Sequence, residues 1–360
     1  MYIRRLFINN FRNIEWLDFE PSSEINLIFG PNGSGKTSLL ESISYLALCR
    51  SFRSSRFQNL IANDKSGFIV SAKVISDDNL ENTLGISRNR SRSNDLQISI
   101  DKKRVYKLAD LVDHICVQII HPQGTDLITG SPELRRHFID WGVYFINPEY
   151  KNIWSEYKKI LSQRNVLLKK RASEAEIIVW DDILCQISEK ITDLRSAYLK
   201  KFIPIFRKKI EEFLPGFDIN ISLSKGWDNG IDIRSLLSLN LEKDRLLGYT
   251  FYGCHRADLK IKTSQLSASE TLSRGQLKLL MCAMKLSQGT LLYEQTGHRC
   301  IYLIDDFTSE LDHNSREVLL KDLSCFSNQV FITNIAGDID LPSHKDILRL
   351  DISKSIQFSA

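Results

Sequence analysis

The chain has 360 residues, more than a single hydrophobic core commonly holds, so we expect two lobes. Hydrophobic residues make up 42% and charged residues 26% of it, as in ordinary globular proteins, and its net charge of +4 is too small to indicate a nucleic-acid partner by itself. No segment approaches the ~20 apolar residues of a membrane span, and the seven scattered cysteines form no C-x-x-C pair, so we expect a cytoplasmic protein with reduced thiols and no membrane partner.

The first strong motif lies at residues 30–37, after residues 1–29, whose apolar positions predict strands of one small sheet. The motif fits G-x-x-x-x-G-K-[ST] and stands between the apolar run 25–29 and a helical pattern that starts at Leu39. Backbone N–H groups of such a P-loop surround a polyphosphate. We expect Lys36 to reach the β- and γ-phosphates and Thr37 to bind Mg²⁺. The residues expected to hold ATP are Gly30, Pro31, Asn32, Gly33, Ser34, Gly35, Lys36, Thr37 and Ser38.

The segment between this motif and residue 120 predicts several strands and one basic stretch. The strand patterns fall at residues 68–70, 84–86, 96–100 and 115–120. The basic stretch carries Arg50, Arg53 and Arg56 at intervals of three residues. These arginines are either a solvated helix end or a patch that contacts DNA phosphates close to the ATP site, and the sequence leaves both readings open.

Residues 145–215 follow the helical period and predict two long helices. Pro204 is expected to bend or end the second of them, since proline disrupts a helix interior. The first helix is much richer in basic than in acidic residues and includes Lys158 and Lys159. Its basic face is either solvated or a contact surface for nucleic acid.

The last third of the chain returns to an α/β pattern, with an apolar strand at residues 300–304 that ends in Asp305 and Asp306. A carboxylate at the end of such a strand faces the Mg²⁺ held over the P-loop. We therefore expect Asp305 to bind Mg²⁺ together with Thr37. We expect Asp306 to point to the other face of the strand and to orient or deprotonate the attacking water. Further strands are predicted at residues 330–334, 347–350 and 356–358.

Residues 272–276 read LSRGQ and resemble the LSGGQ signature of ABC-type ATPases, with Arg274 in place of the first glycine. This resemblance implies an α/β fold: an ABC-ATPase head, a P-loop NTPase of the Rad50/SMC-like kind, with an inserted, mainly helical second lobe. We place the head at residues 1–120 and 241–360 and the helical lobe at 121–240. In ABC-type ATPases the signature contacts the γ-phosphate held by a second copy. The resemblance thus implies a head-to-tail dimer and adds Ser273, Gly275 and Gln276 to the nucleotide-binding residues.

Other positions characteristic of ABC-type ATPases follow by the same resemblance. Residues 309–312 stand where a D-loop belongs, Asn334 stands where a switch histidine is usual, and Gln123 or Gln118 could be the Q-loop residue. The catalytic candidates are then Lys36, Asp305, Asp306 and Gln123. Because Asp306 replaces a glutamate and Asn334 a histidine, we expect slow turnover, as in a switch rather than a motor.

Blocks spread over nearly the whole chain closely resemble the bacterial RecF family. They are residues 10–13, 30–37, 50–53, 130–136, 163–165, 255–259, 272–278 and 304–312. The resemblance implies ATP and Mg²⁺ as cofactors, an ATP-dependent homodimer, weak DNA-dependent ATPase activity, and binding to double-stranded DNA and to junctions of single and double strands. It also implies a nucleoid-associated recombination mediator in DNA repair that acts with RecR and RecO to load RecA at single-stranded gaps.

Two other functions remain compatible with the residues alone. An SMC- or Rad50-like DNA clamp without mediator activity would share every ATPase motif. The ATPase subunit of an ABC transporter would share most of them, but it would need a membrane partner.

Overall fold

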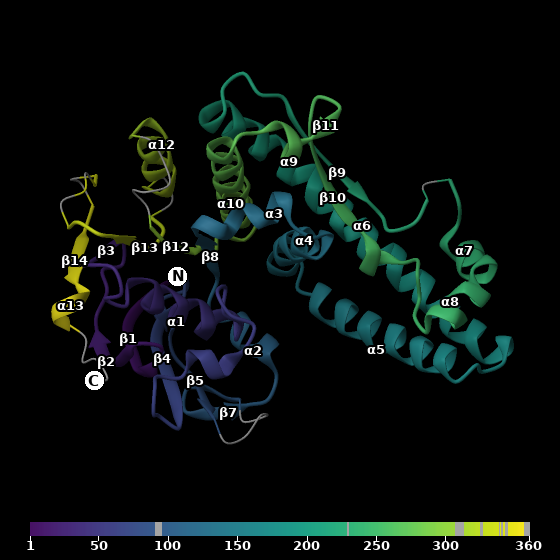
Figure 1. Cartoon of the computed structure of the whole chain (residues 1–360), viewed down its shortest axis with the longest axis horizontal. Helices are drawn as coiled ribbons and strands as arrows, with labels where there is room; N and C mark the ends of the chain where they lie inside the picture. Colours follow the sequence, from purple (N-terminus) through teal and green to yellow (C-terminus); the bar gives the residue numbers. More distant parts are fainter. Residues whose placement is uncertain are drawn as a thin grey trace. The chain divides into compact units, whose positions relative to one another are not determined.

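The computed structural model describes residues 1–90, 96–228, 230–306, 313–324, 327–337, 339, 341–342 and 345–355 (Figure 1). The chain divides into two compact units. The head unit combines Met1–Gly124 with Met281–Ala360, and the helical unit is Thr125–Leu280. The first boundary lies close to the expected residue 120, whereas the second lies at Leu280 rather than at residue 240.

A five-stranded parallel sheet carries the P-loop in the head unit. Its order is β14 (Ile347–Asp351), β3 (Ile25–Phe29), β13 (Val330–Asn334), β12 (Ile301–Ile304) and β8 (Val117–Ile120). The central strands are buried on both faces, which explains why they read as continuous apolar runs instead of alternating ones. The carboxyl ends of β3, β12 and β13 therefore meet at one edge of the sheet. The predicted strand at 356–358 lies outside the described residues.

The other sheet of the head unit is antiparallel, with six strands. Its order is β2 (Ile14–Phe19), β1 (Tyr2–Phe11), β4 (Gly67–Ile75), β5 (Glu81–Asn89), β6 (Gln97–Ile100) and β7 (Lys103–Val105). The prediction that the first three strands form one sheet is wrong, because β3 pairs with β13 and β14 while β1 pairs with β2 and β4. The burial patterns explain the split: β1 has exposed positions on one face, and β3 has none.

Helices complete the head unit. They are α1 (Lys36–Leu48), η1 (Phe57–Leu60), α2 (Leu108–Val112), η2 (Pro122–Thr125), α12 (His313–Ser324), α13 (Ile352–Ser355) and most of α10 (Arg274–Thr296), within which the unit boundary falls. In α1 nearly every side chain is buried, because the helix packs against strands of both sheets. Among the described residues, no helix combines the length and the apolar character that crossing a membrane requires.

The helical unit consists mainly of helices around a small antiparallel sheet. The helices are α3 (Asp126–Thr129), α4 (Pro132–Ile146), α5 (Tyr150–Lys169), α6 (Glu174–Phe213), α7 (Ile233–Leu239), α8 (Leu241–Leu247), η3 (Cys254–Arg256) and α9 (Ala268–Thr271). The sheet has the order β11 (Leu266–Ser267), β10 (Asp258–Thr263), β9 (Ile219–Ser224). Strand β9 packs against α6 and β10 against α4. This packing keeps residues 241–280 in the helical unit, although their sequence pattern had placed them in the head.

Helix α6 is longer than the sequence predicted. It runs for 40 residues through Pro204, which neither ends it nor prevents the last two turns. Proline removes one backbone hydrogen bond, but Phe202 and Phe206 on either side of it are buried and hold both halves of the helix in the core. Tertiary packing here outweighs the local penalty.

A buried ion network joins three helices of the helical unit. The guanidinium of Arg164 on α5 donates to Asp181 on α6 at 2.5 Å and to Asp244 on α8 at 2.7 Å. The same guanidinium donates to the hydroxyl of Thr250 at 2.8 Å. Arg164 and Asp244 are fully buried, and burial raises the pKa of Asp181 while the bond from Arg164 opposes this rise. Replacing one partner would leave the other charges buried and unpaired.

We expect Arg164→Ala to lower the free energy of unfolding of the helical unit by about 3–5 kcal/mol, the usual cost of breaking a buried ion pair. Urea unfolding followed by circular dichroism measures the change. Lys170→Ala on the exposed end of the same helical hairpin is the control and should change the free energy of unfolding by less than about 0.5 kcal/mol. Equal stability of the two variants would show that the Arg164 network contributes little.

Candidate nucleotide-binding site

The P-loop joins β3 to α1, as the motif predicted, and neighbouring side chains hold it open. Gly33 and Gly35 adopt φ values of 82° and 97°, in the left-handed region that favours glycine. The side chain of Asn13 donates to the carbonyl of Gly33 at 2.8 Å and accepts from the hydroxyl of Ser38 at 2.7 Å. Asn13 thus ties the loop to the first turn of α1, and its role was not expected from the sequence.

Lys36 begins α1 and points into the loop. Its ammonium donates to the carbonyls of Gly30 and Pro31 at 2.8 and 2.9 Å. Burial lowers the pKa of Lys36, and the carboxylates of Asp306 and Asp305 oppose this shift. An ammonium whose partners are neutral carbonyls can exchange them for phosphate oxygens, which bind it more strongly.

Asp305 follows the last residue of β12, and two hydroxyls converge on it. Its Oδ1 accepts from Thr37 at 3.0 Å and from Thr333, on β13, at 2.8 Å. Burial raises the pKa of Asp305, and the bonds from Thr333 and Thr37 counteract that rise. The structure therefore brings the two expected Mg²⁺ ligands into direct contact, although 268 residues separate them in the chain.

Asp306 lies in the same cavity as Asp305, not on the opposite face as the strand pattern suggested. The strand ends at Ile304, and the backbone of Asp306 turns into the left-handed region at φ 56°. The N–H of Asp306 then donates to the hydroxyl of Thr333 at 2.8 Å. Both acidic groups consequently face the P-loop.

A cavity of about 690 Å³ opens over the P-loop, a volume typical of a site for a small organic ligand. Besides the P-loop, its lining includes Arg12, Asn59, Ile61, Pro122 and Ile335. The described residues contain no group of three or more His, Cys, Asp or Glu side chains that could hold a metal by themselves. A divalent cation here would rest on Thr37, Asp305 and oxygens of the ligand, which is how Mg²⁺ is commonly bound beside nucleotide phosphates.

Two basic side chains of the cavity share one buried carboxylate. Glu41 on α1 is fully buried and accepts from Arg12 at 2.9 and 2.7 Å. The guanidinium of Arg53 lies 3.6 Å from the same carboxylate. The block at residues 10–13 was the one sequence signal for Arg12, and no pattern pointed to Glu41, which resembles an ordinary acidic residue of a helix.

The arginines and lysines predicted to contact DNA lie in two different parts of the structure. Arg50, Arg53 and Arg56 belong to the irregular loop between α1, which ends at Leu48, and η1, so they are not part of the end of α1. Arg53 lines the nucleotide cavity, while Arg56 is exposed outside it. Lys158 and Lys159 are exposed on α5 of the helical unit.

The structure separates the two Q-loop candidates. Gln118 lies within β8, is buried, and donates to Gln288 at 3.1 Å, so it is a core residue. Gln123 is exposed in η2, next to Pro122 of the cavity wall. Asn334 ends β13; it is buried and donates to the carbonyl of Ala336 at 2.8 Å. The predicted D-loop at residues 309–312 lies outside the described residues.

The signature segment forms the start of α10, in the helical unit. The N–H of Ser273 donates to the side chain of Gln276 at 2.9 Å, and the N–H of Gln276 donates to the hydroxyl of Ser273 at 3.3 Å. This reciprocal cap stabilises the first turn. Ser273 and Gly275 are exposed, and no atom lies within 4 Å of the position a β-carbon on Gly275 would take. An incoming anion can therefore approach the positive end of a 23-residue helix.

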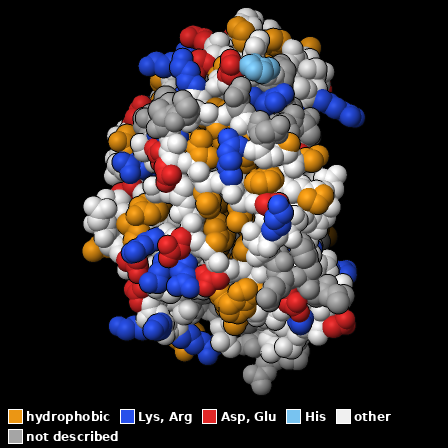
Figure 2. Space-filling model, turned by 90° about the vertical axis from the view of Figure 1, so that its left-hand side faces the viewer, with side chains coloured by type: hydrophobic (Ala, Val, Ile, Leu, Met, Phe, Trp, Pro, Cys, Tyr) orange, Lys and Arg blue, Asp and Glu red, His pale blue; other side chains and the backbone are white. Residues whose placement is uncertain are grey.

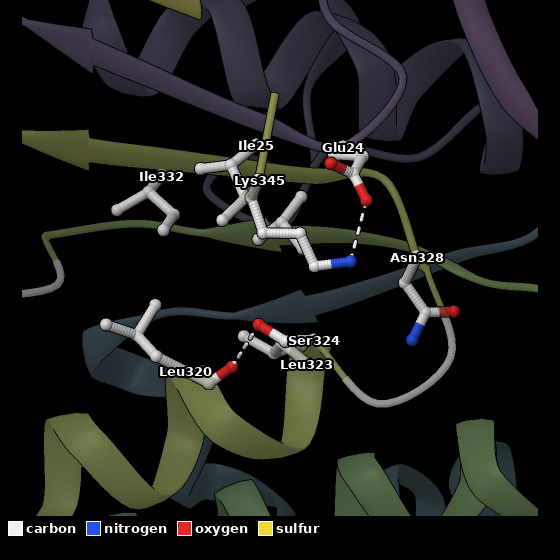
Figure 3. A pocket seen from close by; sticks show the side chains of 9 residues that line it. Glu24, Ile25, Leu320, Leu323, Ser324, Asn328, Ile332 and Lys345 are labelled. Atoms are coloured by element: carbon white, nitrogen blue, oxygen red, sulfur yellow. Dashed lines mark hydrogen bonds and ion pairs between the residues drawn. The ribbon is translucent and has the colours of Figure 1, made fainter. Parts of the chain in front are cut away.

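A further cavity between α12 and the parallel sheet is too small to be a ligand site. Figure 3 shows Lys345 and Glu24 on its rim, joined by an ion pair of 2.6 Å. Its volume is about 10 Å³, about the space of one water molecule. The P-loop cavity is thus the better candidate for the functional site.

We expect Thr333→Val to reduce ATP turnover about 10- to 100-fold, because it removes a hydrogen bond to the carboxylate of Asp305 and the acceptor for the N–H of Asp306. Steady-state hydrolysis at saturating ATP measures the effect. Thr333→Ser keeps the hydroxyl and should retain most of the turnover. Equal losses in the two variants would mean that the threonine matters for packing and not for holding the carboxylates.

Comparison with known proteins agrees with this geometry. A family model described as "RecF/RecN/SMC N terminal domain" matches residues 2–340. "DNA replication and repair protein RecF" of Aliivibrio fischeri strain ES114 is 42% identical over 346 residues, which cover 96% of each chain. The chain belongs to the RecF family. RecF of Vibrio cholerae strain N16961 is 41% identical over 339 residues and 93% of each chain.

Solved structures lead to the same family and fold. A structure described as "the recombination mediator protein RecF-ATP in RecFOR pathway" superposes with a TM-score of 0.84 at 28% identity and covers 94% of this chain and 93% of that one. An Smc head domain derived from Pyrococcus furiosus superposes with a TM-score of 0.55 at 16% identity and supports the fold alone. The predicted ABC-ATPase head of the SMC-like kind and the resemblance to RecF are confirmed.

Proposed function

We propose that this RecF-family protein binds ATP and Mg²⁺ in the head-unit cavity. The observation that carries this proposal is the contact of Thr37 with Asp305 beside the ammonium of Lys36. A hydroxyl and a carboxylate on one side and an ammonium on the other match the parts that hold a nucleoside triphosphate and its metal. The similar structure described as RecF-ATP supports ATP as the nucleotide.

The bound ATP acts as a dimerisation switch in this proposal. Ser273 and Gly275 are exposed at the start of α10, and although Ser273 exchanges hydrogen bonds with Gln276 of the same turn, both residues are accessible to the γ-phosphate held by a second copy. Two such contacts form in a symmetric head-to-tail pair. Hydrolysis removes the γ-phosphate, and the two chains can part.

The biological role that follows is that of a recombination mediator in DNA repair and replication. The relatives are named DNA replication and repair proteins, and the similar solved structure is described as a mediator of the RecFOR pathway. We therefore infer that the ATP-bound dimer binds duplex DNA and its junctions with single strands and acts with RecR and RecO to load RecA at gaps. ATP hydrolysis is weak and stimulated by DNA.

The surface agrees with binding through local basic sites. In Figure 2, basic and acidic side chains are interspersed over the coloured part of the face shown, without one continuous basic area. With a formal net charge of only +4, the chain offers no strong general attraction for a polyanion. Contacts with DNA phosphates must then come from defined clusters.

ATP hydrolysis by the purified protein tests this function. We expect turnover below about 10 s⁻¹, the median for enzymes, and a rise when gapped duplex DNA is added. Faster loading of RecA on gapped DNA in the presence of RecR and RecO would support the mediator role. DNA-stimulated hydrolysis without any effect on RecA loading would favour the SMC-like clamp. A hydrolysis rate that does not change when DNA is added would contradict both the mediator and the clamp function.

A further inference from the structure

A second cavity lies beside the nucleotide cavity in the head unit. It encloses about 480 Å³ between the end of α1, the loop after it, η1 and β5. Three arginines line it, Arg50, Arg53 and Arg88, and no aspartate or glutamate is among its lining residues. We call it the arginine cavity. Its chemistry suits an anion.

Arg88 is fixed in place by neutral groups. Its Nε donates to the hydroxyl of Tyr45 at 3.0 Å, and its guanidinium carbon lies 4.5 Å from the centre of the Phe57 ring. In the described part of the chain, neither Arg88 nor Arg50 has a carboxylate partner. An oriented guanidinium with free terminal N–H groups is well suited to bind a phosphate through two parallel hydrogen bonds.

The loop that forms one wall is also ordered by its own hydrogen bonds. The hydroxyl of Ser51 donates to the buried Glu41 and accepts from the N–H groups of Arg53 and Ser54 at 3.0 and 2.9 Å. This turn anchors the loop to α1 through Glu41. The side chain of Ser55 also lines the cavity and offers a hydroxyl. The wall therefore presents both positive charge and hydrogen-bond donors.

We propose that the arginine cavity is a second phosphate-binding site, separate from the P-loop. The phosphate comes from a nucleic-acid backbone or is free in solution; the preference for nucleic acid rests on the function proposed above. Because Arg53 lines both cavities, a phosphate bound in the arginine cavity competes with the nucleotide site and with Glu41 for this side chain. Binding of DNA in the arginine cavity can thus change ATP binding and hydrolysis through Arg53.

The variants Arg50→Ala, Arg88→Ala and their combination test the site. Arg53 is left intact because it also belongs to the nucleotide cavity. Arg104→Ala is the matched control, since Arg104 also lies over an aromatic ring, that of Tyr106, and is exposed in the same unit outside the cavity. Thermal unfolding of each variant checks the fold. Arg50 is exposed, so its variant remains informative if Arg88→Ala loses stability.

Duplex DNA binding over a range of salt concentrations is the first measurement. We expect each single substitution to weaken binding about tenfold and to flatten the dependence of log K on log salt by about 0.9, the value for one phosphate contact. The affinity of the double variant for duplex DNA should be only slightly lower than that of the single variant with the lower affinity, since both arginines hold the same phosphate. Arg104→Ala should match the unmodified protein.

Calorimetric titration with inorganic phosphate, in saturating ADP that fills the P-loop, is the second measurement. Phosphate binding that is lost in the cavity variants, with unchanged DNA binding, would assign the site to free phosphate. Wild-type behaviour of all cavity variants in both measurements, or an equal effect of Arg104→Ala, would overturn the proposal. A separate calorimetric titration of each variant with ADP reports nucleotide binding, so failure of the proposed function is distinguishable from failure of this site.

Discussion

Lys36→Arg should still bind ATP but should lose at least about 99% of its hydrolysis. The ammonium of Lys36 fits between the carbonyls of Gly30 and Pro31 as a compact charge, and its flexible stem can carry it onto the phosphates. A planar guanidinium keeps the charge but cannot take the same position among the phosphate oxygens. Loss of one well-placed donor to the developing charge commonly costs about 10²–10³ in turnover. Nucleotide binding by calorimetry and single-turnover hydrolysis measure the two effects separately.

The control is Lys73→Arg, since Lys73 is a half-buried residue of β4 that pairs with Glu81 and lies outside the nucleotide cavity. It should leave both binding and hydrolysis unchanged. Hydrolysis by Lys36→Arg within threefold of the unmodified protein would show that the P-loop lysine does not act on the transferred phosphate. Loss of ATP binding as well would mean that the substitution distorts the loop.

Ser273→Arg should abolish ATP-dependent dimerisation while a single chain still binds ATP. The substitution places a bulky side chain at the exposed start of α10, where the γ-phosphate of a partner is proposed to bind. A hydrogen bond to a charged group contributes about 1.5–3 kcal/mol, and a symmetric dimer loses two of them. The dimer should therefore weaken at least about 100-fold. Sedimentation velocity with a non-hydrolysable ATP analogue measures the change.

Ser222→Arg is the matched control, because Ser222 is an exposed serine on β9 of the same unit and the substitution adds the same charge and bulk. It should dimerise like the unmodified protein. If both serine variants fail to dimerise, the added charge and not the signature position is responsible. If neither fails, the signature does not contact the shared nucleotide.

The sequence was sufficient for the core of the nucleotide site because that part depends on local motifs. The P-loop fixes its own backbone through glycines, and the apolar strand before Asp305 identifies the carboxylate. Both motifs end strands of one parallel sheet, so their meeting at its edge could be predicted. Residues that support the site through long-range contacts could not be predicted in this way. Glu41 and Thr333 carry no motif of their own, Asn13 lies in the block at residues 10–13 without an assigned role, and the roles of all three appear only when the strands and α1 are in place.

Errors of the sequence analysis arose where local patterns competed with packing. Alternation along β12 placed Asp306 on the wrong face, because the backbone changes conformation at Asp306, two residues after the strand ends at Ile304. Pro204 was expected to bend or end α6; it does not end the helix, because buried aromatic residues on both sides hold the two halves in the core. Residues 241–280 were assigned to the head, but their strand β10 packs against α4 of the helical unit. The partners of a strand are set by the tertiary fold, which periodicity alone does not reveal.

The central claim is that two chains share each ATP, with Lys36 from one and Ser273 from the other. Mixing Lys36→Arg with Ser273→Arg tests it most directly, since a head-to-tail pair of the two variants contains one site with an intact lysine and an intact serine. Lys36→Arg alone should still dimerise with ATP but hardly hydrolyse it, Ser273→Arg alone should show almost no ATP-dependent dimer and almost no hydrolysis, and the mixture should regain part of the hydrolysis. A mixture no more active than the two variants measured separately, together with normal dimerisation by Ser273→Arg alone, would contradict the claim.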